Sequence, residues 1–473
     1  MVFSSIQFLW VFLPVVLLLY WLFGDRWNIR VGNVILLIAS LFFYAWGEPV
    51  YIFLMLGSVA VNYAGALLIA KFDRQKKLFL FLTVAVNLFL LGYFKYYGLL
   101  TDLVNGAAQK ELLPIKEIAL PLGISFYTFQ AMSYVIDVYR KDVDAQKNFA
   151  KVLLYISLFP QLIAGPIVKY RDIAAQIDER KATLAKRTYG IKRFCYGLAK
   201  KVILANSFGN YADILFDMPS GSLSTGLQWL KMLFYTLQIY FDFSGYSDMA
   251  IGLGSMFGFT FKENFDYPYI SRSIREFWKR WHISLSTWFK EYVYIPLGGN
   301  RKGTGRTYLN LLIVWSLTGL WHGASLNFVA WGLFYFCFLS LERLFLGKAL
   351  DWLNQHRLGI IGLLYSWVVF MCAWVFFREE TLADAVRTLH DMFVYTPGAY
   401  TLAGSLNVFM IVLLVAGILL SGFLQKWIPK LKARLYDKEK VSIPEFIFQA
   451  ALLAICTFQL IGNAYNAFIY FRF

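Results

Sequence analysis

The sequence is poor in charged residues, and this shortage separates it from soluble proteins. Only 16% of its 473 residues are Asp, Glu, Lys or Arg, whereas 59% are hydrophobic and 19% are aromatic. A soluble globular domain carries about 25% charged residues and about 45–50% apolar ones. The large apolar content also excludes an intrinsically disordered chain. The composition therefore predicts an integral membrane protein.

Cysteine is also scarce, and the few cysteines lie far apart in or beside apolar runs. No pair has the spacing of a zinc site or a disulfide framework, so we expect buried thiols and no metal ion. The sequence has neither a Walker pattern nor a Rossmann fingerprint after a strand. The four cysteines are Cys195, Cys337, Cys372 and Cys456.

The N-terminus lacks the two marks of a signal peptide. Residues 6–23 are apolar, but no basic residue precedes them and no small-residue cleavage site follows them. A signal peptide has both features. We therefore expect residues 6–23 to form the first transmembrane helix and to remain in the mature protein.

Long apolar runs are abundant. A helix of about 20 apolar residues crosses a bilayer core, so the runs predict an all-α polytopic membrane protein with about 11–12 transmembrane or re-entrant helices. The run 150–168 is broken by Pro160, Gly165 and Pro166, which favours a re-entrant segment covered by protein. The other runs are 6–23, 31–46, 49–70, 78–97, 119–138, 191–217, 225–258, 308–321, 325–342, 358–377, 405–423 and 443–462.

The charge that remains is lopsided, with 45 Lys and Arg against 29 Asp and Glu and a formal net charge of +16. In a membrane protein this excess lies in cytoplasmic loops, so we expect no nucleic-acid partner. Placing the basic clusters inside puts the N-terminus outside. We predict one membrane domain over 1–473, with cytoplasmic basic or amphipathic segments near 168–201 and 262–306 and an outward tail at 463–473.

His322 follows the apolar run 308–321 and precedes a glycine. At about 1.5 Å per residue, that run is too short to cross a full bilayer core. The hairpin that it forms with residues 325–342 should turn within the membrane or at its outer edge, with His322 deep. An ionisable residue at depth is a candidate for function. The alternative is a core histidine that bonds to a neighbouring carbonyl.

His282 lies in a segment rich in aromatic and basic residues, 277–290. At helical spacing this segment has one aromatic face and one basic face, which predicts an amphipathic helix in the cytoplasmic interface with its tryptophans at headgroup depth. The helix needs no catalytic role for His282, so a structural and a functional role both stay open. His356 and His390 lie in polar loops and are expected at the surface.

Two carboxylates, Asp242 and Asp248, interrupt an otherwise apolar run. Carboxylates in such places line cavities or pair with Arg or Lys, and a structural role and a chemical one are both open. The segment 295–301, which contains Asn300, is a turn by its Pro and Gly content. It does not resemble a loop that cradles phosphate.

Several segments, in order along nearly the whole chain, resemble the membrane-bound O-acyltransferase family. They resemble in particular the bacterial branch that O-acetylates alginate and D-alanylates teichoic acid. The resemblance implies a ring of membrane helices around a thin, funnel-shaped centre. The matching segments are Pro121–Gln130, Tyr240–Asp248, Phe277–Ser286, Tyr294–Asn300, Trp321–Gly323 and Phe468–Phe473.

The resemblance also implies roles for single residues. It implies that His322 is the catalytic histidine and that His282 is its upstream polar partner. A neutral imidazole can take a proton from an attacking hydroxyl and return it to a leaving thiolate. Trp281 and Trp321, beside the two histidines, would keep water away from the acyl group. Asp242, Asp248 and Asn300 are expected to support the site or line its channel.

The C-terminal motif resembles one whose tyrosine carries the acyl group in D-alanylation systems, so Tyr470 is the candidate carrier. A phenol with a pKa near 10 is a good leaving group beside an aliphatic alcohol, so an aryl ester keeps much of the transfer potential of a thioester. The alternative is an aromatic anchor that holds the tail at the membrane interface.

The resemblance implies an acyl donor, a partner and a location. The chain's length and fused tail favour acetyl transfer from acetyl-CoA, or from an acyl-carrier thioester, with no bound cofactor. The acetyl group would pass to a separate extracytoplasmic acetyltransferase similar to serine hydrolases of the SGNH type, which modifies a polysaccharide. The implied location is the bacterial plasma membrane.

Other functions remain open. One is D-alanyl transfer to teichoic acid, and another is acylation of a lipid or protein, which would need His322 but no outward tyrosine. A polysaccharide or lipid transporter would show inverted repeats, whereas the sequence shows one broken segment and no repeat. A scaffold without enzymatic activity would tolerate His322→Ala.

Overall fold

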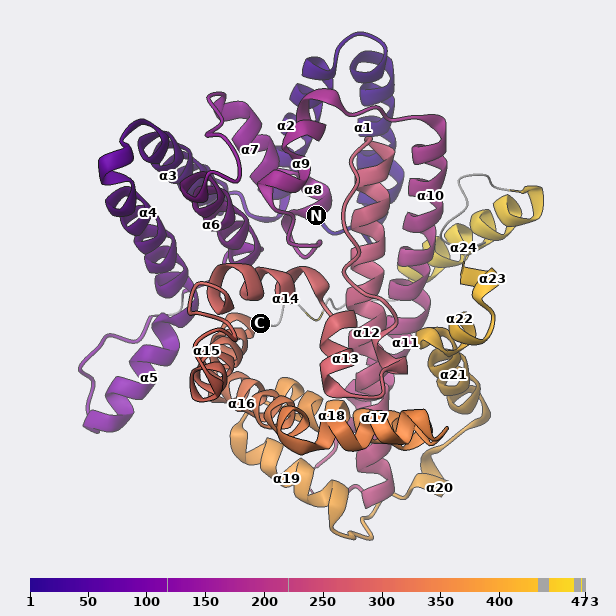
Figure 1. Ribbon diagram of the computed structural model, residues 1–473. Helices are drawn as coiled ribbons and strands as arrows, with labels where there is room; N and C mark the ends of the chain where they lie inside the picture. Colours follow the sequence, from indigo (N-terminus) through magenta and orange to yellow (C-terminus); the bar gives the residue numbers. More distant parts are fainter. Residues whose placement is uncertain (117, 220, 433–441, 463–468, 470–473) are drawn as a thin grey trace. The chain divides into compact units, whose positions relative to one another are not determined.

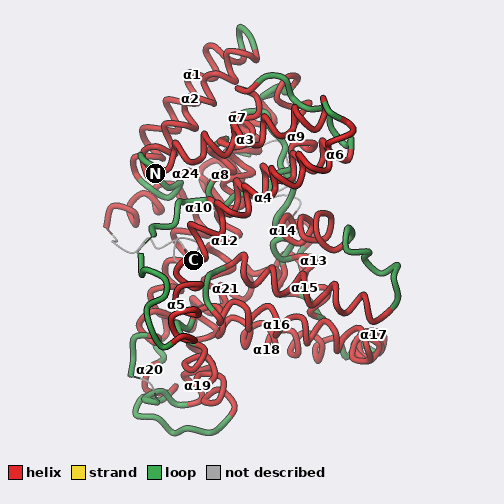
Figure 2. The backbone as a smooth tube through the Cα atoms, turned by 90° about the vertical axis from the view of Figure 1, so that its left-hand side faces the viewer, coloured by secondary structure: helices red, strands yellow, loops and turns green. Residues whose placement is uncertain are grey.

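The described part of the chain is built from helices and contains no strand (Figures 1 and 2). Its two β-bridge partners, Leu223 and Tyr400, make only an isolated contact. An all-helical chain is the fold class that the apolar runs predict, because a helix satisfies its own backbone hydrogen bonds in lipid. In the computed structural model, the description covers residues 1–473 except 117, 220, 433–441, 463–468 and 470–473.

The helices form two compact units, each with its own interior. Each unit is assembled from segments that are distant in the sequence, and α12 (Thr225–Met256) contributes residues to both. Unit 1 comprises Met1–Tyr196, Tyr246–Lys262 and Glu439–Ala451, and unit 2 comprises Gly197–Gly245, Glu263–Lys438 and Leu452–Phe473.

Eight helices among the described residues are long and apolar enough to cross a membrane. All eight coincide with apolar runs read from the sequence, and together they make the chain polytopic. Short π-helical turns extend several of them, as on both sides of α1 (Leu13–Leu19). The eight are Phe8–Asp25, Ile29–Gly47, Tyr51–Lys71, Asp73–Ala108, Leu326–Gln355, Gly359–Arg378, Val408–Trp427 and Ile443–Gly462.

Unit 1 holds the N-terminal helices, and buried polar pairs join some of them. Asn62 on α3 and Asn87 on α4 exchange two amide hydrogen bonds of 2.9 Å in its interior. Each amide therefore satisfies the other, which removes the cost of burying both. The remaining helices of this unit are α2 (Ile29–Gly47), α3 (Tyr51–Lys71), α4 (Lys76–Leu91), α5 (Tyr97–Ala108), α6 (Ile124–Arg140), α7 (Phe149–Ser157), α8 (Phe159–Leu162), α9 (Tyr170–Glu179) and most of α10 (Leu184–Ala199).

The segment 150–168 is broken and buried, as the sequence predicted. Helix α7 ends at Ser157, Leu158 takes a non-helical conformation, and α8 lasts only to Leu162. Nearly every residue of the segment is buried in unit 1. Protein therefore covers the backbone groups that the break leaves outside regular helix.

Unit 2 contains the remaining helices around an aromatic core. Its tightest pair is α15 (Thr304–His322) and α16 (Leu326–Leu341), whose backbones touch at Gly319 and Gly332. A methyl group at either glycine would collide with a carbonyl of the other helix, so only glycine fits there. The others are α11 (Asn206–Phe216), α12, α13 (Ile274–Arg280), α14 (Ile283–Phe289), α17 (Gly347–Gln355), α18 (Gly359–Arg378), α19 (Leu382–Phe393), α20 (Leu402–Ser405), α21 (Val408–Ile418), α22 (Leu424–Trp427), α23 (Pro429–Lys432) and part of α24 (Ile443–Gly462).

One sequence-based prediction for unit 2 is wrong. The segment 277–290 does not form a single amphipathic helix with tryptophans at headgroup depth. It is broken between α13 and α14, and the break is His282, whose backbone is left-handed at φ 43° and ψ 54°. Trp278 and Trp281 are buried in the core. Aromatic packing on several neighbouring helices outweighs the local periodicity of this segment.

Candidate active site

His322 is the last residue of α15 and is buried in unit 2. Three aromatic rings stand edge-on to its imidazole, those of Trp321, Trp331 and Phe377, at centroid distances of 4.9, 4.8 and 5.1 Å. The rings come from α15, α16 and α18. They place the buried imidazole among apolar rings, which limit its access to water.

His282 is completely buried, and a polar cluster fixes its orientation. Asn264 Oδ1 accepts hydrogen bonds from the backbone N–H and the hydroxyl of Ser284, at 3.2 and 2.8 Å. Because a backbone N–H can only donate, this contact identifies the atom as the amide oxygen. The same oxygen lies 3.2 Å from His282 Nδ1, which must therefore carry the hydrogen. The basic nitrogen of the ring is then Nε2.

Burial also determines the charge of His282. Burial lowers the pKa of the imidazole from its ordinary value to about 3, so the ring is neutral at physiological pH. His282 lies outside the eight candidate spans, in the break between α13 and α14. A neutral histidine with a fixed Nδ1–H can orient neighbouring groups without bringing a charge into the core.

Trp321 connects the two histidines. Its indole ring lies 4.9 Å from the His322 ring and 5.9 Å from the His282 ring, centroid to centroid. Phe243 closes the other side of His282 at 4.7 Å. The structure thus brings together three predicted site residues, His282, Trp321 and His322, in one aromatic cluster.

Trp281 lies in the aromatic layer next to this cluster. Its ring stands perpendicular to that of Phe265 at 5.0 Å, and Phe265 in turn stacks beside His282 at 6.5 Å. Trp374 covers it from α18 at 5.0 Å. Trp281 is therefore linked to the His282 ring through the Phe265 ring.

Asp242 on α12 is buried and has two partners. Lys201 Nζ lies 2.7 Å from its Oδ1, and the backbone N–H of Ile469 donates to its Oδ2 at 2.8 Å. Ile469 is itself buried in the hydrophobic core of unit 2. The residue beside Tyr470 is thus tied to the same unit that holds both histidines, whereas Tyr470 itself lies outside the described residues.

Two other predicted site residues lie elsewhere. Asp248 belongs to unit 1, where Arg193 donates to its Oδ1 from Nε and from Nη2 at 2.9 and 2.7 Å. Asn300 is exposed in a turn and accepts a hydrogen bond from the Tyr294 hydroxyl. Asp242 and Asp248 therefore do not form a carboxylate pair, and Asn300 makes its described hydrogen bond within its own turn.

Unit 2 also contains a polar pocket of about 520 Å³. Phe377, which contacts the His322 ring, directly precedes two of its lining residues, Arg378 and Glu379. Asn327 binds the Glu379 carbonyl at 2.7 Å. Six carboxylates and three cationic side chains line the pocket: Asp213, Asp217, Glu379, Glu380, Asp384 and Asp391, with Lys231, Arg378 and Arg387.

Sequence reasoning missed several residues of this site. Asn264 and Ser284, which hold His282, are common polar residues in an unremarkable context, and only the fold brings Asn264 to the break after α13. Trp331 and Phe377 each lie inside a continuous apolar run, where neighbouring aromatic residues hide them. Of Asn264 and Ser284, only Ser284 lies close to His282 in the sequence.

Comparison with known proteins identifies the family of this chain. Residues 140–379 match the membrane-bound O-acyltransferase family model. The chain is 44% identical to the "Probable alginate O-acetylase AlgI" of Pseudomonas putida over 84% of this chain and 81% of that protein. It is 39% identical to the protein of the same name from Azotobacter vinelandii over 100% of both chains. It is 36% identical to the peptidoglycan O-acetyltransferase of Helicobacter pylori over 83% of this chain and 80% of that protein.

The matched region 140–379 includes both histidines and the helices that surround them. The similarity to the Azotobacter protein extends over the whole chain, so the family assignment does not rest on one segment. The eight candidate spans and these relatives make the chain a multi-pass bacterial membrane protein. The family model and the relatives together show that the chain belongs to the membrane-bound O-acyltransferase family.

Proposed function

We propose that this enzyme takes an acetyl group from a cytoplasmic thioester, with acetyl-CoA as the first candidate, and delivers it outward for O-acetylation of an envelope polysaccharide. The observation that carries the proposal is the buried cluster of His322, Trp321 and His282. A fixed neutral imidazole beside a second imidazole in a dry aromatic pocket suits acyl transfer, which needs proton movement and the exclusion of water. The names of the relatives support acetyl as the group.

His322 acts as general base and acid in this proposal. It takes the proton of the attacking hydroxyl as the new C–O bond forms, and returns it to the thiolate as the C–S bond breaks. His282, held by Asn264, keeps the surrounding groups in place. The aromatic rings around His322 make the step efficient, because water at this point would hydrolyse the acyl group.

The attacking hydroxyl is that of Tyr470 in this proposal. The hydrogen bond from the Ile469 N–H to Asp242 is the supporting observation, because it holds the neighbouring residue in unit 2. An acetylated phenol keeps much of the transfer potential of the thioester, since the phenol is a better leaving group than an aliphatic alcohol. The tail thus accepts the acetyl group and offers it to the next acceptor.

The polar pocket of unit 2 is the proposed entrance for that acceptor, because its lining residues Arg378 and Glu379 directly follow Phe377, which contacts the His322 ring. Three ion pairs neutralise part of it: Arg378 with Asp213 at 2.9 Å, Lys231 with Glu379 at 3.4 Å, and Arg387 with Asp384 at 4.0 Å. The remaining carboxylates leave it acidic. A polyuronate such as alginate would be repelled, whereas a basic segment of a partner protein would be attracted. This favours a separate extracytoplasmic acetyltransferase, of the SGNH or serine-hydrolase type, as the next acceptor.

The test is the O-acetyl content of envelope polysaccharides in cells that carry the wild type, His322→Ala or Tyr470→Phe at equal membrane levels. The proposal expects both variants to lose acetylation. Wild-type acetylation with Tyr470→Phe would exclude the tail as carrier, and wild-type acetylation with His322→Ala would exclude His322 as base. Loss of D-alanyl esters with unchanged acetyl esters would instead support the teichoic acid alternative. A transporter would lose polymer export in both variants.

A further inference from the structure

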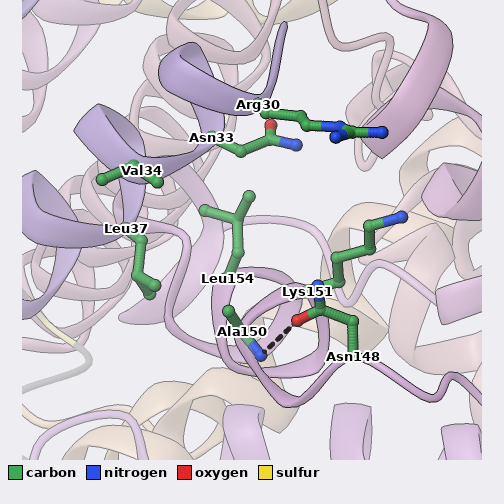
Figure 3. A pocket seen from close by; sticks show the side chains of 8 residues that line it. All are labelled: Arg30, Asn33, Val34, Leu37, Asn148, Ala150, Lys151 and Leu154. Atoms are coloured by element: carbon green, nitrogen blue, oxygen red, sulfur yellow. Dashed lines mark hydrogen bonds between the residues drawn. The ribbon is translucent and has the colours of Figure 1, made fainter.

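Unit 1 contains a second pocket, of about 310 Å³, between the first turns of α2 and α7 (Figure 3). It has no part in the proposed transfer of the acyl group. Its lining changes from polar to apolar along both helices. Arg30 and Lys151 stand in the first turns of the two helices, and Leu37 and Leu154 lie farther along them. The complete lining is Arg30, Asn33, Asn148 and Lys151, with Val34, Leu37, Ala150 and Leu154.

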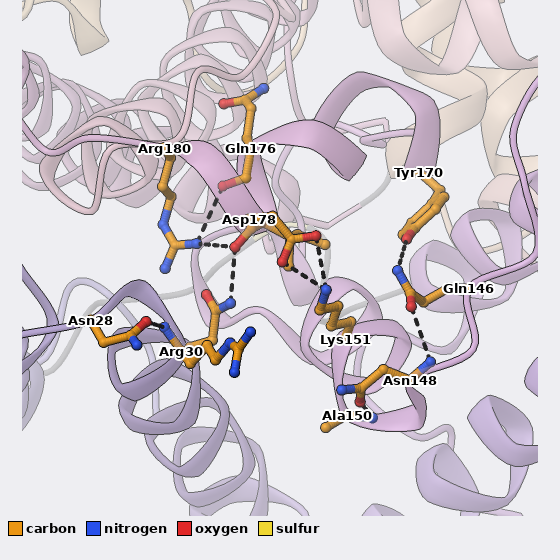
Figure 4. Close-up of polar contacts among 12 residues, drawn as sticks. Asn28, Arg30, Gln146, Asn148, Ala150, Lys151, Tyr170, Gln176, Asp178 and Arg180 are labelled. Atoms are coloured by element: carbon orange, nitrogen blue, oxygen red, sulfur yellow. Dashed lines mark hydrogen bonds and ion pairs between the residues drawn. The ribbon is translucent and has the colours of Figure 1, made fainter.

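The two cationic side chains of this pocket differ in their pairing. Lys151 lies on the wall formed by α7, and its Nζ contacts Asp178 at 2.7 Å (Figure 4). Arg30 extends over the pocket from α2, is exposed, and has no carboxylate partner among the described residues (Figure 3). Since Asp178 neutralises Lys151, the pocket keeps one uncompensated positive charge, which matches one phosphodiester.

The helix termini themselves do not supply the binding groups. Asn28 caps α2 by accepting from the Arg30 backbone N–H, and Asn148 caps α7 by accepting from the Ala150 N–H, both at 2.9 Å. The Asn33 amide is likewise engaged, because its Nδ2 donates to the Ile177 carbonyl at 2.9 Å. The direct contacts to an anion must therefore come from the Arg30 and Lys151 side chains, while the two helix dipoles favour negative charge nearby.

The apolar half of the pocket indicates that the ligand has a hydrocarbon part. The side chain of Val34, on the candidate membrane span α2, is 54% exposed. Leu37 follows it one turn later, and Leu154 faces the pocket from α7. A free phosphate or a soluble nucleotide would leave this apolar wall in water, whereas an acyl chain would cover it.

We propose that this pocket binds a phospholipid with one net negative charge. The phosphodiester lies between the Arg30 guanidinium and the Lys151 ammonium, and the beginning of an acyl chain lies along Val34 and Leu37. The topology read from the basic clusters puts the start of α2 on the cytoplasmic side, where anionic headgroups are available. Such a lipid would join α2 to α7 and stabilise unit 1.

The test measures thermal unfolding of the purified full-length protein in detergent, titrated with phosphatidylglycerol, phosphatidylcholine or inorganic phosphate. Phosphatidylglycerol should raise the unfolding midpoint in a saturable way, and the other two should not. An equal effect of phosphatidylcholine would overturn the charge recognition. An equal effect of inorganic phosphate would show a simple anion site and overturn the lipid.

Matched variants assign the effect to this pocket. Arg30→Gln should weaken the apparent affinity for phosphatidylglycerol about tenfold, because one charge-assisted contact is lost. Arg26→Gln is the control, since Arg26 is an exposed neighbour that stacks over Trp21 at 4.3 Å and does not line the pocket. Leu37→Trp should fill the apolar half and also weaken lipid binding. Equal affinities for Arg30→Gln, Arg26→Gln and the wild type would refute the proposal.

Discussion

The two buried histidines of unit 2 differ in the contacts that the structure describes, although both contact the Trp321 indole. Polar atoms hold His282, whose Nδ1–H is directed at Asn264 Oδ1. Rings surround His322, which stands at the end of α15 with Trp331 and Phe377 edge-on to it. The comparison suggests a division of labour. In the proposed mechanism, His282, which is fixed by an amide, positions its neighbours, and His322, which lies among aromatic rings at the end of a helix, exchanges protons with the substrates.

The largest effect should come from His322→Ala. Loss of a general base and acid should lower the rate of acetyl transfer about 10²–10⁴-fold. The rate is measured as acetylation of the C-terminal tail when the purified enzyme is incubated with acetyl-CoA. The unfolding midpoint shows whether the fold is intact. A rate within threefold of the wild type would reverse the roles assigned to the two histidines.

The next largest effect concerns the anchor of the tail. Asp242→Asn leaves the buried Lys201 without its counter-charge, which costs about 3–5 kcal/mol. Asp248→Asn is the matched control, because it removes the carboxylate that pairs with the buried Arg193 in unit 1, just as Asp242→Asn removes the one that pairs with Lys201. Both variants should be less stable, but only Asp242→Asn should lower acetylation of the tail per folded molecule. Equal acetylation in the two variants would separate Asp242 from the tail.

Asn264→Ala should have a smaller effect, since it removes only the group that orients His282. Loss of this buried contact should lower the free energy of unfolding by about 1–3 kcal/mol. It should also remove the acceptor that keeps the hydrogen of the imidazole on Nδ1. Asn264→Asp, which keeps an acceptor at the same place, should restore more of the transfer rate than Ala does. If both substitutions leave the rate unchanged, the orientation of His282 is irrelevant to the chemistry.

The smallest effect is a change in acid sensitivity. The pKa of His282 in the folded state is about 3, below its ordinary value, so the unfolded state binds a proton that the folded state excludes. Stability should therefore fall as the pH decreases below about 6.5, by at most about 1.4 kcal/mol per pH unit. Thermal unfolding of the wild type between pH 7 and 5 should be more acid-sensitive than that of His282→Gln. Parallel curves would show that His282 is protonated in the folded enzyme.

Much of the fold could be predicted from composition, because a run of apolar residues must become a helix in lipid. All eight candidate spans lie in runs read from the sequence. The broken segment at 150–168 followed from Pro160 and Gly165. The failure at 277–290 has a clear cause: local periodicity predicts one helix, whereas the left-handed backbone at His282 depends on packing against Phe243 and on the hydrogen bond that His282 Nδ1 donates to Asn264 Oδ1.

The sequence indicated candidate site residues only where an ionisable residue stands in or beside an apolar run. His322 and Asp242 interrupt apolar runs, which drew attention to both. Asp248 gave the same signal, yet it forms an ion pair with Arg193 in the other unit, so burial of charge alone does not identify a site. Asn264 gave no signal, because its importance depends entirely on a contact with a residue 18 positions away.

The central claim is that His322 activates Tyr470 for acetyl transfer. Its most direct test is peptide mass spectrometry of the purified enzyme after incubation with acetyl-CoA, beside His322→Ala treated in the same way. The account predicts an acetyl group on Tyr470 in the wild type and none in His322→Ala. An acetyl group on Tyr470 in both proteins would contradict the role of His322. Its absence from both folded proteins, also after an acyl-carrier thioester is offered, would contradict the tail as carrier.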